Sequence, residues 1–226
     1  MSGYSFDNPS PRFTLLSELY REVHEAGLVD GADASKVFGG GSLLDHIEIV
    51  GRLSNHTRAK SILDYGSGKG LLYEAEHLEL PGGKVIRSVQ EYWNVDDIHL
   101  YDPGVEEYAA RPTGGYDGVI STDVLEHIPE EDIDWVLAEC FSMASGFLYM
   151  NIASYPAKKI LPNGWNAHVT IQPPAWWQDK IGTAAQGWGG EAYVFDITEK
   201  RNRLWGSILR RLGGSRFKLT RIESWG

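Results

Sequence analysis

The stretch ILDYGSGKG, residues 62–70, decides the fold of this chain. It places Asp64 and three glycines, Gly66, Gly68 and Gly70, directly behind an apolar run. Residues 61–66 read as a buried strand and residues 70–80 as a helix, so the glycines fall at a strand-to-helix junction. A ligand at such a junction lies against bare peptide groups. That ligand is a nucleotide phosphate, a dinucleotide, or a group of another kind.

Two of these ligands fit the stretch poorly. A P-loop needs a glycine where this chain has Leu63, and a hydroxyl that binds magnesium where it has Gly70. A dinucleotide turn needs G-x-G-x-x-G, which is a different spacing, and Asp64 would repel a pyrophosphate. A carboxylate suits a ligand that carries an ammonium group and no phosphates. S-adenosylmethionine is such a ligand.

The rest of the chain alternates strands and helices. Amphipathic helices are expected at 13–28 and 43–53, the second with Ser42 as N-cap. This alternation predicts an α/β fold with a mostly parallel sheet and helices on both faces. We expect one domain over residues 1–226, with a helical lid over 1–60 and a core over 61–226. The other expected elements are strands at 96–103, 116–122 and 146–154, helices within 123–144, and closing strands, one or both antiparallel, at 192–198 and 216–225.

Composition limits the functional classes. The 226 residues carry 31 Asp and Glu against 21 Lys and Arg, a formal charge of −10, so nucleic acid is disfavoured as a partner. A single cysteine, Cys140, lies in an apolar helical pattern and predicts a structural role in a reducing compartment. The sequence shows neither a long apolar run nor a signal-like N-terminus. We therefore expect a cytoplasmic protein without a membrane partner.

The glycine-rich stretch resembles the first motif of the class I S-adenosylmethionine-dependent methyltransferases, which runs acid-x-Gly-x-Gly-x-Gly, and the likeness spans residues 61–154. The resemblance implies a Rossmann-like sheet and an acid on the ribose, for which Asp102 is the candidate and Glu91 the alternative. Because only residues 105–115 separate Asp102 from the next strand, the family's third strand must be shrunken. The cofactor residues that the resemblance implies are Asp64, Tyr65, Gly66, Ser67, Gly68, Gly70, Asp102, Pro103, Thr122 and Asp123.

A second constellation lies at the end of the strand at 116–122. If residues 123–128 are helical, Asp123, Glu126 and His127 fall at i, i+3 and i+4 and point to one side. With His168 they would form a site for a divalent metal. The pattern is similar to that of ubiquinone-pathway O-methyltransferases and small-RNA 3'-end 2'-O-methyltransferases, where the resemblance implies a metal that binds the hydroxyl. Asp123 stands where those relatives carry Glu, and it could instead cap the helix.

Without a metal, His168 is the candidate general base, because methyl transfer to oxygen requires removal of a proton. The loop that carries it is polar, aromatic and basic. From this loop we expect Tyr155 as a second catalytic residue and Lys158, Lys159 and Trp165 as substrate contacts. The remaining histidines are expected to be structural: His24, His46, His56, His77 and His99.

The sequence thus predicts a methyltransferase that moves a methyl group from S-adenosylmethionine to an oxygen of a small or medium-sized acceptor, leaving S-adenosylhomocysteine. Three alternatives stay open. The acceptor could be a short RNA 3' end, bound by Lys158, Lys159 and C-terminal arginines. The chain could be a non-catalytic partner subunit that binds S-adenosylmethionine, or, remotely, a nicotinamide-dependent reductase. The acceptor and the oligomeric state stay open.

Overall fold

The computed structural model describes residues 3–26, 40–201 and 217–225. Within these ranges, six strands form one sheet in the order β4-β1-β5-β6-β7-β8. The first five are parallel and β8 runs antiparallel at the edge. The expected α/β fold with a mostly parallel, Rossmann-like sheet is therefore confirmed. The strands are β1 Ser61–Tyr65, β4 Asp97–Tyr101, β5 Tyr116–Thr122, β6 Ala144–Ser154, β7 Ala192–Lys200 and β8 Phe217–Trp225.

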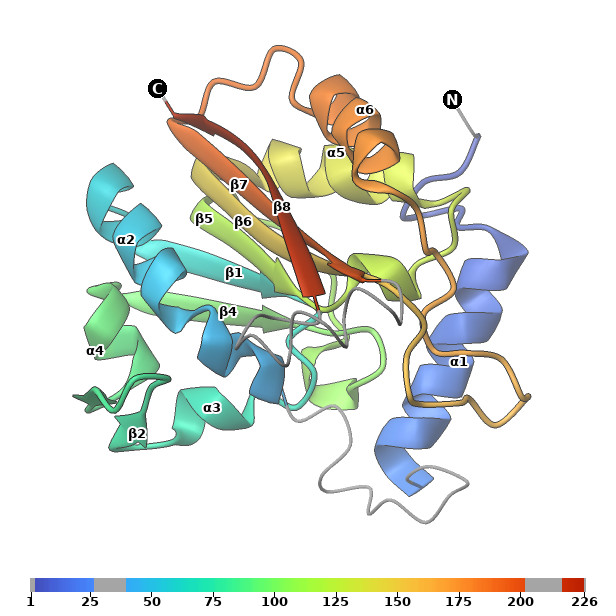
Figure 1. Cartoon of the computed structure of the whole chain (residues 1–226), viewed down its shortest axis with the longest axis horizontal. Coiled ribbons are helices and arrows are strands. Elements are labelled where there is room, and N and C mark those ends of the chain that lie inside the picture. The colour runs from blue at the N-terminus through green and yellow to red at the C-terminus, as the bar shows by residue number, and fades with distance from the viewer. Residues whose placement is uncertain (1–2, 27–39, 202–216, 226) are drawn as a thin grey trace.

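Helices cover both faces of the sheet, and one more helix lies beside its carboxyl end (Figure 1). One face packs against α2 and α4, and the other packs against α5 and α6. Helix α1 packs against the chain that follows β6. The helices are α1 Pro11–Ala26, α2 Ile47–Thr57, α3 Leu71–Glu74, α4 Val89–Trp93, α5 Ile133–Met143 and α6 Pro174–Ala184, with short 3-10 turns at Gly41–Asp45, Glu106–Tyr108 and Leu125–His127.

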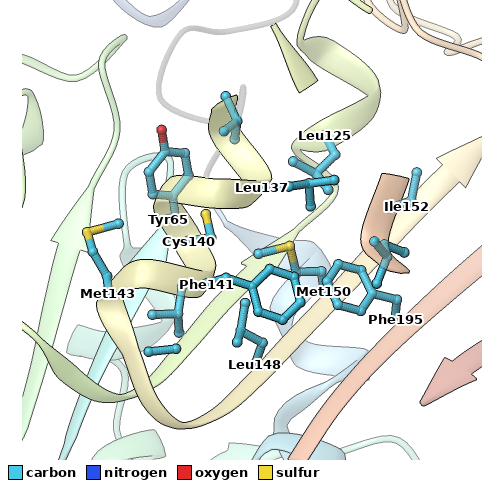
Figure 2. Close-up of a cluster of buried hydrophobic side chains, with 14 of the residues drawn as sticks. Tyr65, Leu125, Leu137, Cys140, Phe141, Met143, Leu148, Met150, Ile152 and Phe195 are labelled. Atoms are coloured by element: carbon cyan, nitrogen blue, oxygen red, sulfur yellow. The ribbon is translucent and has the colours of Figure 1, made fainter. Parts of the chain in front are cut away.

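The central strands are apolar because they are buried on both faces. Figure 2 shows the core on the α5 side, where Cys140 and Phe141 of α5 meet Met150 of β6 and Phe195 of β7. Fully burying one such side chain contributes about 1.5–3 kcal/mol. Cys140 has no exposed surface, in agreement with its expected structural role. None of the helices in the described ranges combines the length and apolarity that a membrane crossing requires.

Several expected elements are wrong in detail. The helix at 70–80 ends at Glu74, and the chain then forms a hairpin of β2 (Leu78–Glu79) and β3 (Val85–Ile86). Ser42 caps no helix, since it lies inside the turn Gly41–Asp45. The closing strands, by contrast, agree with the expectation that one or both are antiparallel, since β7 is parallel to β6 and β8 is antiparallel to β7.

The short third strand that we expected after Asp102 is absent from the described residues. Residues 105–115 hold only the 3-10 turn Glu106–Tyr108, and β4 is the edge of the described sheet. The proposed helix over 123–128 is also wrong. Asp123 has φ +54°, a left-handed conformation that interrupts a right-handed helix, and one 3-10 turn follows it.

Candidate functional site

A cavity of about 610 Å³ lies where β1, β4, β5 and β6 end, with α1 along its wall. Open parallel sheets hold their ligands at this carboxyl edge. The structure brings twelve of the expected site residues to the cavity wall: Tyr65, Gly66, Gly68, Asp102, Pro103, Thr122, Asp123, His127, Tyr155, Lys158, Lys159 and His168. It places five others off that wall: Asp64, Ser67, Gly70, Glu126 and Trp165.

The glycine-rich loop is held against the neighbouring strand. The backbone N–H groups of Gly66 and Ser67 donate to the carbonyl of Tyr101, at 2.7 and 3.1 Å. Gly66 has φ +90°, and a Cβ there would lie 2.4 Å from a methyl carbon of Val124. Gly70 serves packing, because its Cβ would lie 2.6 Å from Leu100. Thus the first glycine brings bare backbone to the cavity and the third allows the chain to turn into α3.

Asp102 joins the ends of β1 and β4. One of its carboxylate oxygens accepts the N–H of Gly68 and the other accepts the N–H of Gly104, both at 2.8 Å. Burial raises the pKa of Asp102, while the nearby His24 of α1 and these two N–H groups oppose that rise. The alternative acid, Glu91 of α4, does not line the cavity; it forms an exposed ion pair with Arg87.

Asp64 lies below the loop. It is 2% exposed, and its Oδ2 accepts the hydroxyl of Tyr73 at 2.7 Å. Its Oδ1 has no hydrogen-bond partner among the described residues. Burial raises the pKa of Asp64 to about 7, although the Tyr73 hydrogen bond acts in the opposite direction. The Asp64 carboxylate therefore lies off the cavity wall, bound to Tyr73.

His127 and His168 line the other end of the cavity, and Glu126, which is buried and off the cavity wall, converges with them. Each offers one ligand atom, and these atoms all lie within 4.8 Å of one another. The backbone carbonyl of Glu126 accepts the N–H groups of Val169 and Thr170, which brings the loop with His168 to the turn with His127. The two imidazole rings lie 4.9 Å apart and nearly perpendicular.

The two imidazoles present the same nitrogen. His168 Nδ1 lies 2.6 Å from the carbonyl of Tyr155, and His127 Nδ1 lies 2.9 Å from that of Ala167. A carbonyl only accepts, so both Nδ1 atoms carry the proton and both Nε2 atoms carry the lone pair. Burial lowers the pKa of His127 to about 3 and lowers that of His168 too, so both rings are neutral.

Glu126 completes a donor set that fits a divalent metal. It has no exposed surface; its Oε1 accepts the N–H of Ala153 at 2.8 Å, and its Oε2 has no hydrogen-bond partner in the described part of the chain. Burial, and then Asp123, raise the pKa of Glu126 well above its usual range. A buried carboxylate oxygen without a donor is costly, and a cation beside two neutral imidazoles would satisfy it.

Asp123 lies outside that group of three. Its backbone N–H donates to Asn151 at 3.2 Å and its Oδ1 accepts from the same amide at 2.7 Å. It lines the cavity between the glycine-rich loop and His168. The expectation that Asp123 points with Glu126 and His127 from one helix face is wrong, because its left-handed backbone breaks that face. Its possible capping role is likewise excluded, since it begins no helix.

Aromatic and basic side chains form the wall near His168. The ring of Tyr155 lies 5.1 Å from that of Phe217 on β8, and both line the cavity with Lys158 and Lys159. Burial lowers the pKa of Lys159, and Asp123 opposes this. Trp165 is 41% exposed and faces Arg12 instead.

The sequence placed α1 in an expected helical lid but identified none of the α1 residues that line the cavity. Five of its residues line the cavity: Phe13, Leu16, Ser17, Tyr20 and His24. Their spacing of three and four was a usable signal, since it places them on one helix face. His24, which we expected to be structural, lies beside Asp102. Phe217, the first residue of β8, also lines the cavity and was not expected there.

Comparison with known proteins gives one distant relative. The chain is 28% identical over 144 residues to a ubiquinone biosynthesis O-methyltransferase of Thiobacillus denitrificans, an alignment that covers 51% of this chain and 60% of that protein. The chain thus spans less than two thirds of that relative's length. No family model matches the chain, and no solved structure matches it. The similarity and the mostly parallel sheet together support a methyltransferase.

Proposed function

We propose that this chain is an S-adenosylmethionine-dependent methyltransferase that methylates an oxygen of a small or medium-sized acceptor. One observation carries the proposal. One cavity is lined both by a glycine-rich loop that is tied to Asp102 and by His127 and His168, with which the buried Glu126 converges. The first half suits a cofactor without phosphates, and the second suits a hydroxyl that must lose a proton.

The cofactor half would hold S-adenosylmethionine through backbone and two acids. Gly66 and Gly68 line the cavity, so the methionine part would lie against their backbone, and Asp102 lines it where a ribose would lie. Asp64 lies beneath and would favour a cationic ligand when it is ionised. Thr122 and Asp123, at the end of β5, border the space between the two halves. These residues would align the methyl group with the acceptor.

In the reaction, the bond from the methyl carbon to sulfur breaks while a bond from that carbon to the acceptor oxygen forms. The sulfur keeps the electron pair of the broken bond, which gives S-adenosylhomocysteine, and the hydroxyl proton leaves. Glu126, His127 and His168 would hold a divalent cation, which when bound lowers the pKa of the hydroxyl. In an enzyme without metal, the Nε2 lone pair of His168 would take the proton.

The acceptor site lies between the aromatic wall and the lysines. Phe13, Tyr155 and Phe217 can flank a ring, and Lys158 and Lys159 add positive charge to a chain of net charge −10. We propose a small-molecule acceptor over RNA, because the net charge of −10 would repel a long polyanion. We also place the protein in the cytoplasm, in line with its one buried cysteine.

The test is methyl transfer from labelled S-adenosylmethionine to a panel of hydroxylated ring compounds, with Mn²⁺ or with EDTA. We expect transfer in Mn²⁺, a loss of at least about tenfold in EDTA, and the same loss in Glu126→Gln, whose amide is a poor metal ligand. Glu79→Gln on the exposed hairpin is the matched control and should keep full activity. Transfer that survives both EDTA and Glu126→Gln would contradict the metal and favour His168 as the base.

A further inference from the structure

Tyr20 of α1 contacts His127, one of the three converging residues. The Tyr20 hydroxyl lies 2.8 Å from His127 Nδ1 and donates to the Ala167 carbonyl at 2.7 Å. That carbonyl lies 2.9 Å from the same Nδ1. Three segments that are distant in sequence therefore meet at one point: α1, the turn Leu125–His127, and the loop before His168.

Apolar packing brings the hydroxyl to this point. Leu16 and Val23 of α1 are buried against Leu161 and Ala167 of the loop, in a cluster separate from the cores of the sheet. Tyr20 packs against this cluster, and its ring meets that of His127 edge to face at 5.4 Å. The loop thus depends on α1 for its apolar contacts as well as for this hydrogen bond.

The contact fixes His127 in a particular state. Because the Ala167 carbonyl accepts from both the Tyr20 hydroxyl and His127 Nδ1–H, the ring can neither flip nor exchange its tautomer without breaking a buried hydrogen bond. Nε2 then carries the lone pair. A ligating histidine is commonly oriented in this way by a group bound to its other nitrogen.

We propose that Tyr20 is a positioning residue, which locks His127 and the Ala167 carbonyl together so that α1 completes the Glu126–His127–His168 site. Its expected effect on metal affinity rests on the proposed function. The orientation of His127 does not, since it can be measured in the protein without metal.

The experiment compares the wild type with Tyr20→Phe, which removes only the hydroxyl. Tyr92→Phe is the matched control, because its hydroxyl accepts from Lys84 on the hairpin side of α4, away from the cavity. Nitrogen-15 NMR of the histidine rings reports the tautomer and the exchange of the Nδ1 proton. Calorimetric titration with Mn²⁺ reports the affinity, and titration with S-adenosylmethionine reports the other half of the cavity.

We expect His127 in the wild type to carry its proton on Nδ1, in slow exchange with water. In Tyr20→Phe this exchange should accelerate and Mn²⁺ should bind about 10- to 100-fold more weakly, with S-adenosylmethionine binding unchanged. Tyr92→Phe should match the wild type in all three measurements.

Two results would overturn the proposal. One is a wild-type His127 protonated on Nε2, a measurement that does not depend on whether the variant folds. The other is a folded Tyr20→Phe whose Nδ1 exchange matches the wild type. If the wild type binds no Mn²⁺, the metal assignment fails by itself, and the exchange comparison still decides the role of Tyr20.

Discussion

Asp64 is the acid near the glycine-rich loop whose burial makes stability and the proposed cofactor binding depend on pH. Its folded pKa of about 7 lies far above that of an unfolded Asp, so between about pH 4 and pH 7 the folded protein binds more protons than the unfolded chain. The free energy of unfolding therefore falls as the pH rises through this window. At pH 8 the buried carboxylate is charged, so the free energy of unfolding is lowered there by the cost of burying that charge.

Replacing Asp64 by a neutral residue should therefore raise the stability of the fold and lower the affinity for S-adenosylmethionine. Asp64→Asn cannot ionise and can still accept from Tyr73, so at pH 8 it should be more stable than the wild type by about 1–3 kcal/mol in urea unfolding. Its affinity for S-adenosylmethionine should be lower. In the wild type that affinity should rise from pH 6 to pH 8, and in the variant it should stay flat. An equal pH dependence in both proteins would exclude Asp64 as its source.

Gly66 offers a test of the close approach between loop and cavity. An alanine there would combine φ +90° with a Cβ 2.4 Å from Val124, so Gly66→Ala should weaken S-adenosylmethionine binding at least about tenfold and destabilise the fold. Gly82→Ala is the control, since it has φ +100° with no atom within 4 Å of its Cβ. The control should lose only stability, which thermal unfolding and calorimetry together would show. Equal losses of binding in both variants would mean that backbone strain alone is responsible.

For single residues, the sequence predicted which ones line the cavity better than it predicted where their side chains point. Gly66, Gly68 and Asp102 reached the cavity, because strand ends in a parallel sheet converge at one edge, and His168 reached it through the loop after β6. Asp64 turned inward to Tyr73 and Trp165 turned out to Arg12. The direction of neither side chain follows from sequence spacing, because each depends on a partner that only the tertiary fold brings close.

Among the elements, α1 is the one whose attachment can be tested separately. The buried carboxylate of Asp132 accepts both the backbone N–H and the hydroxyl of Ser10, and that hydroxyl also accepts the N–H of Phe13. Ser10 is thus the N-cap of α1 and its anchor to α5. Pro11 follows at the first helical position, where it is favoured.

Ser10→Ala should lower the free energy of unfolding by about 1–3 kcal/mol, because it removes a cap and leaves a buried carboxylate oxygen without its donor. Urea unfolding would measure the loss. Ser142→Ala on the exposed face of α5, which loses a bond to the Glu139 carbonyl, should cost much less. If both variants lose the same amount, Ser10 does not anchor α1.

The order of strands and helices was predictable, while the short elements were not. Long buried strands such as β6 carry a strong apolar signal. Residues 70–80 looked helical, yet Gly82 and Gly83 adopt positive φ and close a hairpin that buries Leu80 and Ile86 in the cluster formed by α2, α4 and the sheet. In the turn after β5, the left-handed Asp123 replaced a helix by one 3-10 turn. In both places a backbone conformation that periodicity cannot report decided the outcome.

At the scale of the whole molecule, residues of the sheet, α1 and the loop after β6 line one cavity with two chemically different ends. The glycine-rich loop and two acids form one end. Two neutral imidazoles and a buried glutamate form the other. This division is what a transfer reaction between a cationic donor and a hydroxyl requires.

The most direct test is calorimetric titration of the purified wild-type chain with S-adenosylmethionine at pH 8. We predict binding of one molecule per chain, which is lost when S-adenosylhomocysteine already fills the cavity. The account would be contradicted by the absence of binding, or by a dinucleotide such as NADPH that binds in this cavity and excludes S-adenosylmethionine.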